Sequence, residues 1–560
     1  MADGQSTSKV SPTTYDSIES EPLLPLPKQE RKQKQVLLKL ILVVQVLIFA
    51  ALVPLYYYSF SRTGKHPVGS AAPTNSVFPD FDIKQHWGSF SPYFDSGDVY
   101  PGVDSAERFA ENGLPDEQCR FKQVHVLHRH AERYPTPDSH RPMRKTADKL
   151  KRLDSKQAVS HPLLTNWDFG LSTALLVPTG TGTEFSSGAL FWATHGRLLF
   201  NASEKGYLFY DPSLNLYENG TSAADSLPVL RATSQSRIRT SARNWAAGFF
   251  GLFGEDLLVS DEKRDAKPKT KLYELVEQIE GRGINNTLAG YYSCKNAGNS
   301  SYTSGVERVE KWVDIYLVKA AERLQKYFFP HLKVESTDLE HVLTPFDAFA
   351  IQKLCVHETA AYGNLSPFCT LFTREEWEGY EYSEALSFFG FASYGTVLGA
   401  SEGAGWIHEL LARLEHRTIT EPAYGVNVTL TGSEETFPLD QPLYVDLSHD
   451  SVIISVITAL GLDFLKEDLK STIIPRERNF RISRLTPFGA RLYVELYECT
   501  PGDVLVRLKL NNRILPLKGL EHCDGTVCAL NDFTKSLAVA LKNIDYDEIC
   551  FGTPENVDWE

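Results

Sequence analysis

The longest apolar stretch of the chain covers residues 36–58 and is interrupted only by Lys39, Gln45 and Pro54. As a helix these 23 residues would span about 35 Å, which is enough to cross a bilayer. A buried core helix is the alternative interpretation, but the run is unusually long and uniform for one. The pattern therefore predicts one transmembrane helix over 36–58.

The charges that flank this run indicate its orientation. Only Arg62 and Lys65 follow it closely, whereas five basic residues precede or open it: Lys28, Arg31, Lys32, Lys34 and Lys39. By the positive-inside rule, the N-terminal end stays in the cytosol. A cleavable signal peptide normally has shorter charged and apolar regions. We therefore expect an uncleaved type II signal anchor, with the C-terminal part lumenal or extracellular.

Polar segments lie on both sides of the predicted anchor. Residues 1–35 lack apolar periodicity and predict a disordered cytosolic tail. Within this tail, residues 19–24 resemble an acidic dileucine signal, which indicates a vacuolar or endosomal destination. Residues 59–80 are rich in Ser, Pro, Gly and Thr and predict a stalk. Aromatic residues return at 85–94, which we expect to pack as an arm on a domain over 81–560.

Beyond the arm, apolar residues recur with a period of either two or about 3.6 residues. Alternation or short apolar runs predict strands, and one hairpin, at 123–127, 443–447 and 504–517. Helical spacing predicts helices over 308–329, 406–416 and 451–460, the last ending at Gly461. The pattern indicates an α/β fold, in which a large α/β sandwich domain carries a smaller helical domain inserted at roughly 245–430.

Composition mainly restricts the partners of the chain. The 57 Lys and Arg residues against 71 Asp and Glu residues give a formal net charge of −14. General nucleic-acid binders usually carry a basic surface, so we expect no nucleic-acid partner. If the protein binds an anion, it must do so in a local group of basic side chains.

Two features that follow the predicted anchor indicate an oxidising compartment. Six N-x-Ser/Thr glycosylation sequons begin at Asn201, Asn219, Asn285, Asn299, Asn364 and Asn427. The eight cysteines allow up to four disulfides, although spacing alone does not fix their pairing. These cysteines are Cys119, Cys294, Cys355, Cys369, Cys499, Cys523, Cys528 and Cys550.

The densest group of chemically active side chains follows the first predicted strand. His125, His128 and His130 invite a metal site, but in a strand His125 and His128 face opposite sides, and no nearby Cys or Asp completes a ligand set. We therefore expect no metal. Arg129 and Arg133 instead have the forked donors that match phosphate oxygens, with His130 between them as a candidate nucleophile. A solvated charged turn is the alternative interpretation.

A second group, Ser448-His449-Asp450, lies between a predicted strand and a predicted helix. Open α/β sheets place their active sites at such strand ends. His449 could donate to a phosphoryl oxygen and Asp450 could protonate a leaving alcohol, or Asp450 could simply cap the helix. A third group contains Arg231 and Arg237 and precedes an apolar helix, which suits either an anion site or a surface charge run.

A competing pattern lies at Gly399-Ala-Ser401-Glu-Gly403, which matches the G-x-S-x-G nucleophile elbow of serine hydrolases. Asp446 and His449 follow in the order that such enzymes use. However, both would lie on one short strand and turn, whereas elbow hydrolases take these partners from separate loops. This interpretation is kept as the alternative enzyme class.

The sequence from Arg129 to Thr136, Arg-His-Ala-Glu-Arg-Tyr-Pro-Thr, resembles the R-H-G-x-R-x-P signature of histidine acid phosphatases. His449-Asp450 resembles the second, H-D, motif of this family. The likeness is greatest to fungal phytases and phytase-like acid phosphatases, and it extends over most of 85–550. It includes the block Asn364-Leu-Ser-Pro-Phe-Cys369. The resemblance implies a phosphomonoesterase that works at acidic pH through a phosphohistidine and needs no cofactor.

The same resemblance implies roles for individual residues. His130 would be the nucleophile and Asp450 the proton donor, and the phosphate would be held by Arg129, Arg133, Arg237 and His449. Arg237 is preferred to Arg231 because it begins a stretch that matches the family's R-x-x-x-S pattern. The implied disulfides are Cys119–Cys499, Cys294–Cys550, Cys355–Cys369 and Cys523–Cys528.

Two features bear on substrate and activity. Phytases surround the phosphate site with basic residues, and this chain offers four after Thr136: His140, Arg141, Arg144 and Lys145. These residues suit a polyphosphorylated, phytate-like substrate but also fit a solvated loop, so broad phosphomonoesterase activity remains open. The chain has Ala131 where the family usually has Gly. If that position needs a positive φ, the site would be weakened, and the protein could then be an inositol-phosphate-binding protein rather than an enzyme.

Overall fold

The computed structural model describes residues 80–95, 99–101, 103, 119–202, 204–211, 214, 227–251, 272–332, 340–500 and 502–553. All of them lie in the second of two units, Asn75–Glu560. The predicted tail, the predicted anchor at 36–58 and the predicted stalk up to residue 79 lie outside the described residues. Within the described part of the chain, no helix is both long and apolar enough to cross a membrane.

An eight-stranded sheet forms the centre of this unit, with the strand order β3-β2-β4-β1-β5-β6-β7, and β8 pairs with β6. The first four in this order are parallel to one another, and the remaining strands are antiparallel to their neighbours. Their bounds are β1 (Cys119–Arg129), β2 (Val229–Thr233), β3 (Glu274–Gln278), β4 (Leu443–Ser448), β5 (Arg491–Cys499), β6 (Asp503–Leu510), β7 (Arg513–Ile514) and β8 (Val527–Ala529). The strands predicted at 123–127 and 443–447, and the hairpin, are confirmed.

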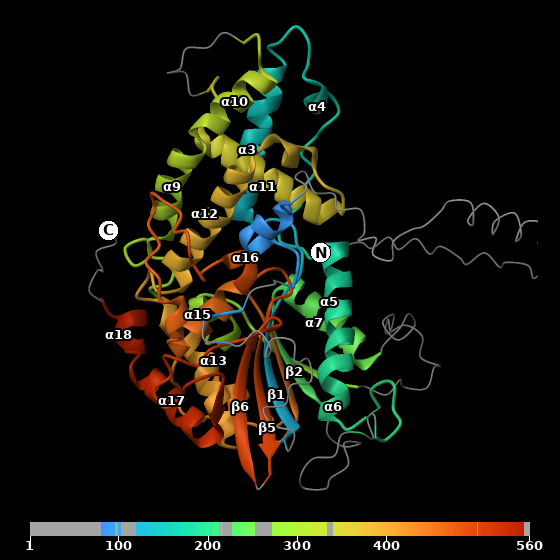
Figure 1. Cartoon of the computed structure of the whole chain (residues 1–560), viewed down its shortest axis with the longest axis vertical. Helices are drawn as coiled ribbons and strands as arrows, with labels where there is room; N and C mark the ends of the chain where they lie inside the picture. Colours follow the sequence, from blue (N-terminus) through green and yellow to red (C-terminus); the bar gives the residue numbers. More distant parts are fainter. Residues whose placement is uncertain are drawn as a thin grey trace, which may run out of the picture. The chain divides into compact units, whose positions relative to one another are not determined.

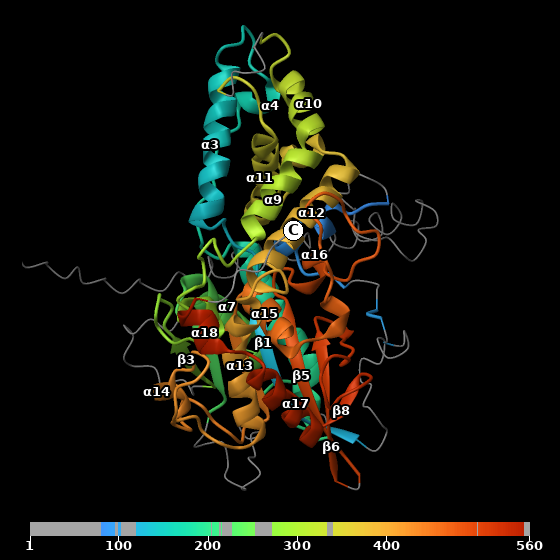
Figure 2. The same cartoon turned by 90° about the vertical axis from the view of Figure 1, so that its left-hand side faces the viewer.

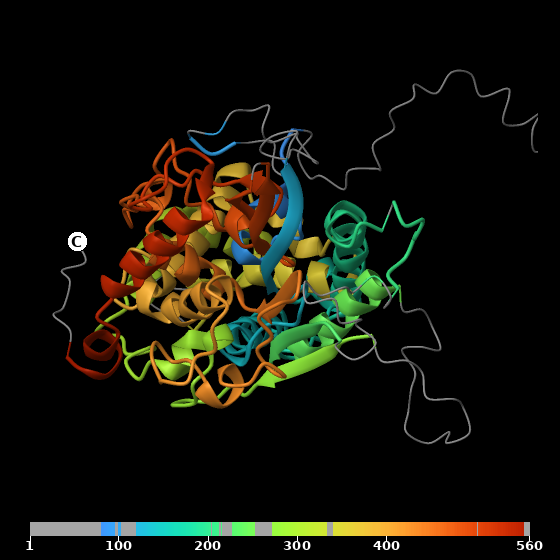
Figure 3. The same cartoon turned by 90° about the horizontal axis from the view of Figure 1, so that it is seen from below.

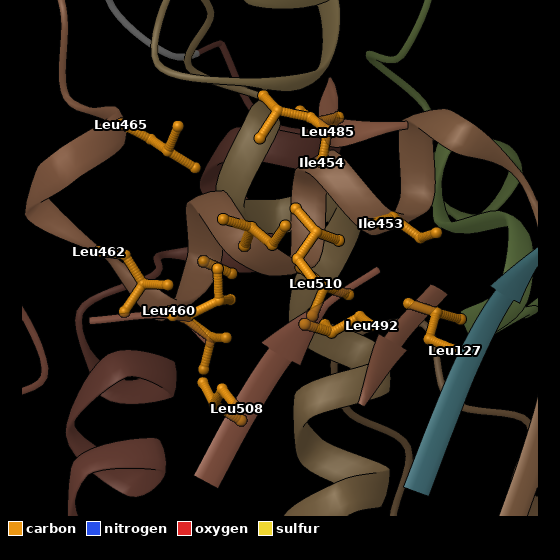
Figure 4. Packing of buried hydrophobic residues seen from close by; sticks show 14 of the residues in the cluster. Leu127, Ile453, Ile454, Leu460, Leu462, Leu465, Leu485, Leu492, Leu508 and Leu510 are labelled. Atoms are coloured by element: carbon orange, nitrogen blue, oxygen red, sulfur yellow. The ribbon is translucent and has the colours of Figure 1, made fainter. Parts of the chain in front are cut away.

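Helices cover both faces of the sheet (Figures 1 and 3). On one face, Val124 and Val126 of β1 belong to a core shared with α5 (Pro178–Phe191) and α7 (Ser236–Phe250). On the other face, Leu127 joins a larger core, as Figure 4 shows around Ile453 and Leu492. The helices that contribute to it include α13 (Gly399–Leu414), α15 (Asp450–Leu460) and α17 (Leu530–Lys542). Successive side chains of β1 point to opposite faces of the sheet, so the strand contributes residues to both cores.

A separate body of helices lies beyond one end of the sheet (Figure 2). It contains α3 (Pro137–Asp154), α9 (Gly305–Tyr316), α10 (Val318–Phe328), α11 (Pro345–Tyr362) and α12 (Arg374–Ala392). The predicted bounds of the helical insertion, 245–430, therefore need correction. The body takes α3 from an earlier part of the chain, while β3 and α13, both inside 245–430, belong to the sheet and its cover. Helical periodicity reveals that a helix is amphipathic, but not which core its apolar face meets.

Two local predictions can be compared directly with the structure. The helix predicted over 308–329 is two helices, because Leu317, at φ −107° and ψ 2°, ends α9 and begins α10. The arm is confirmed: η1 (Ile83–His86) and η2 (Gly88–Phe90) place Trp87 and Phe90 in the core of the helical body.

The smaller elements are α4 (Pro162–Thr165), η3 (Trp192–Gly196), α6 (Arg197–Leu199), η6 (Thr287–Ala289), α8 (Gly290–Ser293), η7 (Pro367–Leu371), α14 (Val428–Thr431), η8 (Asp463–Leu465), α16 (Ile482–Leu485) and α18 (Tyr546–Phe551).

All eight cysteines are paired as the family resemblance implies. The disulfides are Cys119–Cys499, Cys294–Cys550, Cys355–Cys369 and Cys523–Cys528. Four of the sequon asparagines are exposed: Asn201, Asn285, Asn299 and Asn364. Asn427 is half-buried and caps α14, and Asn219 lies outside the described residues. Glycosylation of these positions stays a prediction.

Candidate active site

The parallel pairing of β1 with β4 brings the two sequence motifs together. In this register Arg129 lies opposite Ser448, and the His130 backbone N–H donates to the Ser448 carbonyl at 3.2 Å. The His130 and His449 rings follow directly, with their centroids 5.8 Å apart and their planes nearly perpendicular. α15 starts at the next residue, Asp450. The groups predicted from distant parts of the sequence thus form one site at the carboxyl ends of adjacent parallel strands.

The His130 side chain has the protonation state that a nucleophile needs. Its Nδ1 lies 2.8 Å from the Ala131 carbonyl oxygen. Because a carbonyl only accepts, this contact assigns the ring proton to Nδ1 and leaves a lone pair on Nε2. Burial, and then the positive charges of Arg237, Arg129 and Arg133, hold the pKa of His130 well below its usual range. The imidazole is therefore neutral even in mildly acidic solution.

Arg129 is fixed from several directions. It forms an ion pair with Asp450, with the guanidinium nitrogen 2.7 Å from Oδ2. Another of its nitrogens donates to the carbonyls of Thr486, at 2.6 Å, and of Ser89 in the arm. Its guanidinium lies over the Phe488 ring, 4.6 Å from the centroid. The side chain is completely buried, so these contacts hold a desolvated cation beside the nucleophile.

Arg133 and Arg237 add two more cations around His130. Arg133 lies over the Phe90 ring at 5.7 Å and donates to the Tyr134 carbonyl at 3.1 Å. Arg237 is the second residue of α7, and its buried Nε has no hydrogen-bond partner among the residues that the structure describes. The charges of both arginines act on the His130 ring. Three guanidinium groups thus converge on one imidazole, an arrangement that favours a bound anion.

Arg231, the alternative to Arg237, has a different environment. Its guanidinium pairs with Asp446 and with Glu409, in each case at 2.7 Å, and is almost completely buried. Trp406 and Arg413 also contact the Asp446 carboxylate. Arg231 therefore belongs to an ion network inside the domain, whereas no described residue forms an ion pair with Arg237, which suits it to an anion.

Glu280 is a site residue that the sequence analysis missed. It lies two residues after β3, and its Oε1 is 2.8 Å from Nε2 of His449. Burial lowers the pKa of His449, and the hydrogen bond and the charge of Glu280 partly offset this. An acidic residue just after a parallel strand would have been the signal, but the strand itself, Glu274–Gln278, was not predicted. Its polar sequence does not resemble a buried parallel strand.

Asp450 has an unusual environment for a proton donor. Burial raises the pKa of its carboxyl, but the charges of Arg129, Arg133 and His449 outweigh burial and hold the pKa below its usual range. Its Oδ1 also accepts from the Ser451 backbone N–H at 2.9 Å. In the absence of a ligand, Asp450 is therefore ionised in mildly acidic solution.

The four candidate specificity residues lie on the first three turns of α3, and most are exposed. Arg141 pairs with Asp138, and Arg144 pairs with Asp148 at 3.1 Å; both arginine side chains are more than half exposed. Lys145 is also exposed. His140 is half-buried, and its Nε2 lies 3.1 Å from the Leu171 carbonyl. Of the four, His140 is the one whose charge acts on a buried group near the site, His357.

The structure does not support two alternatives from the sequence. Ser401 is the third residue of α13 and is buried, so no sharp strand-to-helix turn exposes its hydroxyl as in a nucleophile elbow. His449 bonds to Glu280 rather than to Asp446. The three histidines do not form a metal site either, because His125 stacks on Tyr444 while His128 pairs with Glu184 of α5 on the opposite face.

Ala131 does not require glycine-like backbone geometry. Among the described residues, the non-glycine positions with positive φ are Ala174, Asn201, His416, Tyr424 and Asn511. The condition under which alanine would strain the backbone at this position, a positive φ, is therefore not met.

An Ala131→Gly variant should consequently be no better an enzyme. We expect its free energy of unfolding to fall by about 0.5–1 kcal/mol, because glycine gains more backbone freedom on unfolding. Its kcat should stay within about twofold of the wild-type value. Urea unfolding and initial rates of phosphate release would measure both quantities, and a large gain in kcat would show that the Ala131 methyl obstructs the site.

Comparison with known proteins places these residues in a family context. The sequence model of the histidine phosphatase superfamily (branch 2) matches residues 120–511. Phytase A of Aspergillus oryzae is 29% identical over 90% of this chain and 99% of its own length. Phytase A of Neurospora crassa is 27% identical over 90% of this chain and 100% of its own length.

Solved structures resemble the chain in fold. The phytase from D. castellii has a TM-score of 0.60 at 22% identity, and the match covers 87% of this chain and 92% of that one. The multiple inositol polyphosphate phosphatase of Bifidobacterium longum, in complex with inositol hexasulfate, has a TM-score of 0.53 at 13% identity. That match covers 83% of this chain and 99% of that one.

Proposed function

Since the chain belongs to the histidine phosphatase superfamily (branch 2) and is a phosphoric monoester hydrolase, we propose that it removes phosphate from phytate-like inositol phosphates at acidic pH through a phosphohistidine on His130. One arrangement carries the proposal: Nδ1 of His130 faces the Ala131 carbonyl at 2.8 Å, which leaves Nε2 as the nucleophilic atom, and the charges of three buried or half-buried guanidinium groups act on this ring. Such a site attracts a phosphate ester and presents a nucleophile to it.

The proposed reaction has two steps. Nε2 of His130 forms a bond to phosphorus while the bond from phosphorus to the ester oxygen breaks, and Asp450 gives its proton to the departing oxygen. Water then attacks the phosphohistidine, Asp450 takes a proton from that water, and inorganic phosphate and free His130 result. Arg129, Arg133 and Arg237, with His449, stabilise the charge on the phosphoryl oxygens in both steps. Glu280 holds the His449 ring in place.

The low pKa of Asp450 raises the question of where its proton comes from. The ion pair with Arg129 keeps the free carboxyl ionised, so the free enzyme lacks the proton that the leaving group needs. A phosphomonoester loses its second proton near a pKa of about 6, so below this pH the substrate itself brings one. We propose that Asp450 receives this proton when the phosphate displaces it from Arg129 and Arg133.

This origin of the proton predicts a specific pH dependence. kcat/KM should fall above the second pKa of the substrate, because that parameter reports on the free enzyme and the free substrate. Below this pH, His130 can still act as the nucleophile, because its lowered pKa keeps the imidazole unprotonated. For two aryl phosphates with different second pKa values, the pH at which kcat/KM falls on the alkaline side should therefore differ by the difference between those pKa values. If kcat/KM fell at the same pH for both substrates, the titrating group would be on the protein.

The experiment that tests the activity measures phosphate release by the full-length chain from phytate and from a simple aryl phosphate between about pH 3 and 8. Turnover of phytate at acidic pH would support the proposal. Turnover of the aryl phosphate but not of phytate would show that the enzyme is a general phosphomonoesterase. A folded, disulfide-paired chain that releases no phosphate from either substrate would exclude catalysis.

We also propose that the enzyme is a type II membrane protein with a glycosylated catalytic domain outside the cytosol. The apolar run at 36–58, the exposed sequon asparagines and the four disulfides support this topology. In sealed microsomes, the C-terminal domain should resist added protease, and its mobility should shift after treatment with an N-glycosidase. Digestion of the domain without detergent would contradict this orientation.

A further inference from the structure

A hollow of about 260 Å³ lies at the end of the sheet opposite the candidate active site. Arg120 and Lys122 at the start of β1 line it, whereas the active site follows Arg129 at the end of the same strand. The strand between Lys122 and Arg129 is about 23 Å long. Open α/β sheets bind their substrates at the carboxyl ends of the strands, so the proposed mechanism does not use this hollow.

Apolar and polar side chains together line the hollow. Its apolar part includes Leu414 of α13, Leu496 of β5 and Val504 of β6, and its polar part includes Arg120 and Gln123 of β1. Binding sites for small organic molecules commonly combine an apolar lining with a few polar groups. Such a lining suits a ligand that has both C–H faces and hydroxyl groups.

Carboxylates offset several of the positive charges in this lining. Glu498 forms ion pairs with Arg120 and with Lys122, the latter at 3.9 Å. An oxygen of Asp440 lies 3.1 Å from Nδ1 of His416, and both of these residues line the hollow. These carboxylates would repel a bound anion, so the hollow suits a neutral polar ligand better than a phosphate.

Asn201, the asparagine of a glycosylation sequon, also lines the hollow. It is exposed, follows α6 closely and has the left-handed φ of 51° that asparagine tolerates. Its backbone N–H donates to the Leu198 carbonyl at 3.1 Å, and its carbonyl accepts from the Lys205 N–H at 3.3 Å. Its Nδ2 donates to the Glu204 carboxylate at 2.8 Å. These contacts hold the atom to which a sugar would be attached at the wall of the hollow.

We infer that the hollow holds the first sugar of an N-linked glycan on Asn201. The inference rests on the proposed topology, because only a domain outside the cytosol would receive such a glycan. In the transfer, Nδ2 loses one hydrogen and forms a bond to C1 of an N-acetylglucosamine. The bond from C1 to the donor, an oligosaccharide on a lipid diphosphate, breaks, and the lipid diphosphate leaves with the proton. The remaining N–H of Nδ2 can still donate to Glu204.

Weak contacts are enough to hold this sugar, because it is attached beside the hollow. A ligand on a short tether has an effective concentration in the millimolar range, so an affinity of the same order keeps it bound. The C–H face of the sugar ring can pack on Leu496 and Val504, and its hydroxyl groups can bond to Arg120 or Gln123.

The test compares two glycans on the native full-length chain, made in a secretory host that adds high-mannose glycans. Endoglycosidase H cuts between the first two sugars, so a docked first sugar shields that bond. Glycopeptide mass spectrometry would give the cleavage rates at Asn201 and at Asn299, an exposed sequon asparagine outside the hollow. We expect cleavage at Asn201 to be at least about tenfold slower, as for a docked state populated about 90% of the time. After denaturation and disulfide reduction the two rates should be equal.

Two substitutions would fill the hollow from different sides. Val504→Trp adds a large ring from β6, and Lys205→Trp adds one from an exposed position of the lining. Both should raise the cleavage rate at Asn201 to that at Asn299. Val306→Trp, at an exposed valine of α9, is the matched control and should leave both rates unchanged. Thermal unfolding of each variant would show that it is folded.

The outcomes separate this inference from the proposed topology. Slow cleavage at Asn201 that is lost in either filled variant but kept in the control supports the docked sugar. Equal rates at Asn201 and Asn299 in the native chain, or slow cleavage that persists in both filled variants, would overturn it. A chain glycosylated at Asn299 but not at Asn201 would also overturn it while the proposed topology stands. A chain without a glycan at any sequon would overturn both.

Discussion

Replacing His130 with alanine is expected to lower kcat by about 10⁴-fold or more for every phosphate ester tested. The change removes the atom to which phosphorus would become bonded, and Nε2 of the neighbouring His449 is already engaged by Glu280 at 2.8 Å. Initial rates of phosphate release from the full-length variant would measure the loss. Mixing with radiolabelled substrate followed by alkaline denaturation should trap label on the wild-type chain and none on the variant.

The matched control for this experiment is His125→Phe. His125 is on β1, which ends one residue before His130, and it is equally buried, but its ring stacks on Tyr444 of β4 at 4.5 Å. Phenylalanine keeps that stack, so kcat should change by less than about threefold even if the free energy of unfolding falls by about 1 kcal/mol. A His130→Ala variant that retained more than about 1% of the wild-type kcat would exclude the phosphohistidine.

Replacing Asp450 with asparagine should have the second largest effect, and its size should depend on the leaving group. General acid catalysis contributes about 10²–10⁴-fold, so kcat for an alkyl phosphate such as phytate should fall within that range. An aryl phosphate with a strongly acidic phenol needs little protonation, so its first step should slow much less. The informative quantity is the ratio between the loss of kcat for phytate and the loss of kcat for the aryl phosphate, because each substrate is the control for the other on the same protein.

The Asp450→Asn variant also loses the ion pair with Arg129. The Kd of inorganic phosphate would show how this loss affects binding of the anion. Asparagine can still contact Arg129, but it carries no charge to compete with an entering phosphate. We therefore expect inorganic phosphate to bind the variant at least as tightly as the wild type. Equal losses of kcat for both leaving groups, together with weaker phosphate binding, would show that Asp450 positions Arg129 rather than transferring a proton.

The parts of the site that sequence reasoning could predict are the ones with strong local patterns. The first motif lies at the end of a strand in which polar and apolar residues alternate, and the second follows a short apolar strand and is followed at once by an apolar helix that stops at Gly461. These signals are visible in a window of twenty residues, and parallel pairing of the strands then makes His130 and His449 neighbours.

The parts that could not be predicted depend on contacts between distant segments. Glu280 follows a strand of charged and apolar residues that pairs only at the sheet edge, and periodicity does not distinguish such a segment from a helix. Phe90, Phe488 and the carbonyls that accept from Arg129 come from the arm and from a loop after α16. These groups reach Arg129 only because distant segments of the chain fold back onto it. A single sequence contains no local pattern that predicts such contacts.

The position of β1 in the sheet has a consequence for biosynthesis. Of the strands that the structure describes, β1 is made first, yet it lies between β4 and β5, and its Cys119 pairs with a cysteine 380 residues later. At about 5–20 residues per second, roughly 20–80 s of translation separate the two cysteines.

During that interval both edges of an apolar strand are unpaired, and Cys119 can react with the cysteines of the helical body. The helical segments at 305–392 can collapse early, but the central sheet can be completed only after β8, which ends at Ala529, has been made. The yield of folded protein should therefore depend on chaperones and on catalysed disulfide exchange, and a nascent chain stopped before β5 should be a substrate for degradation.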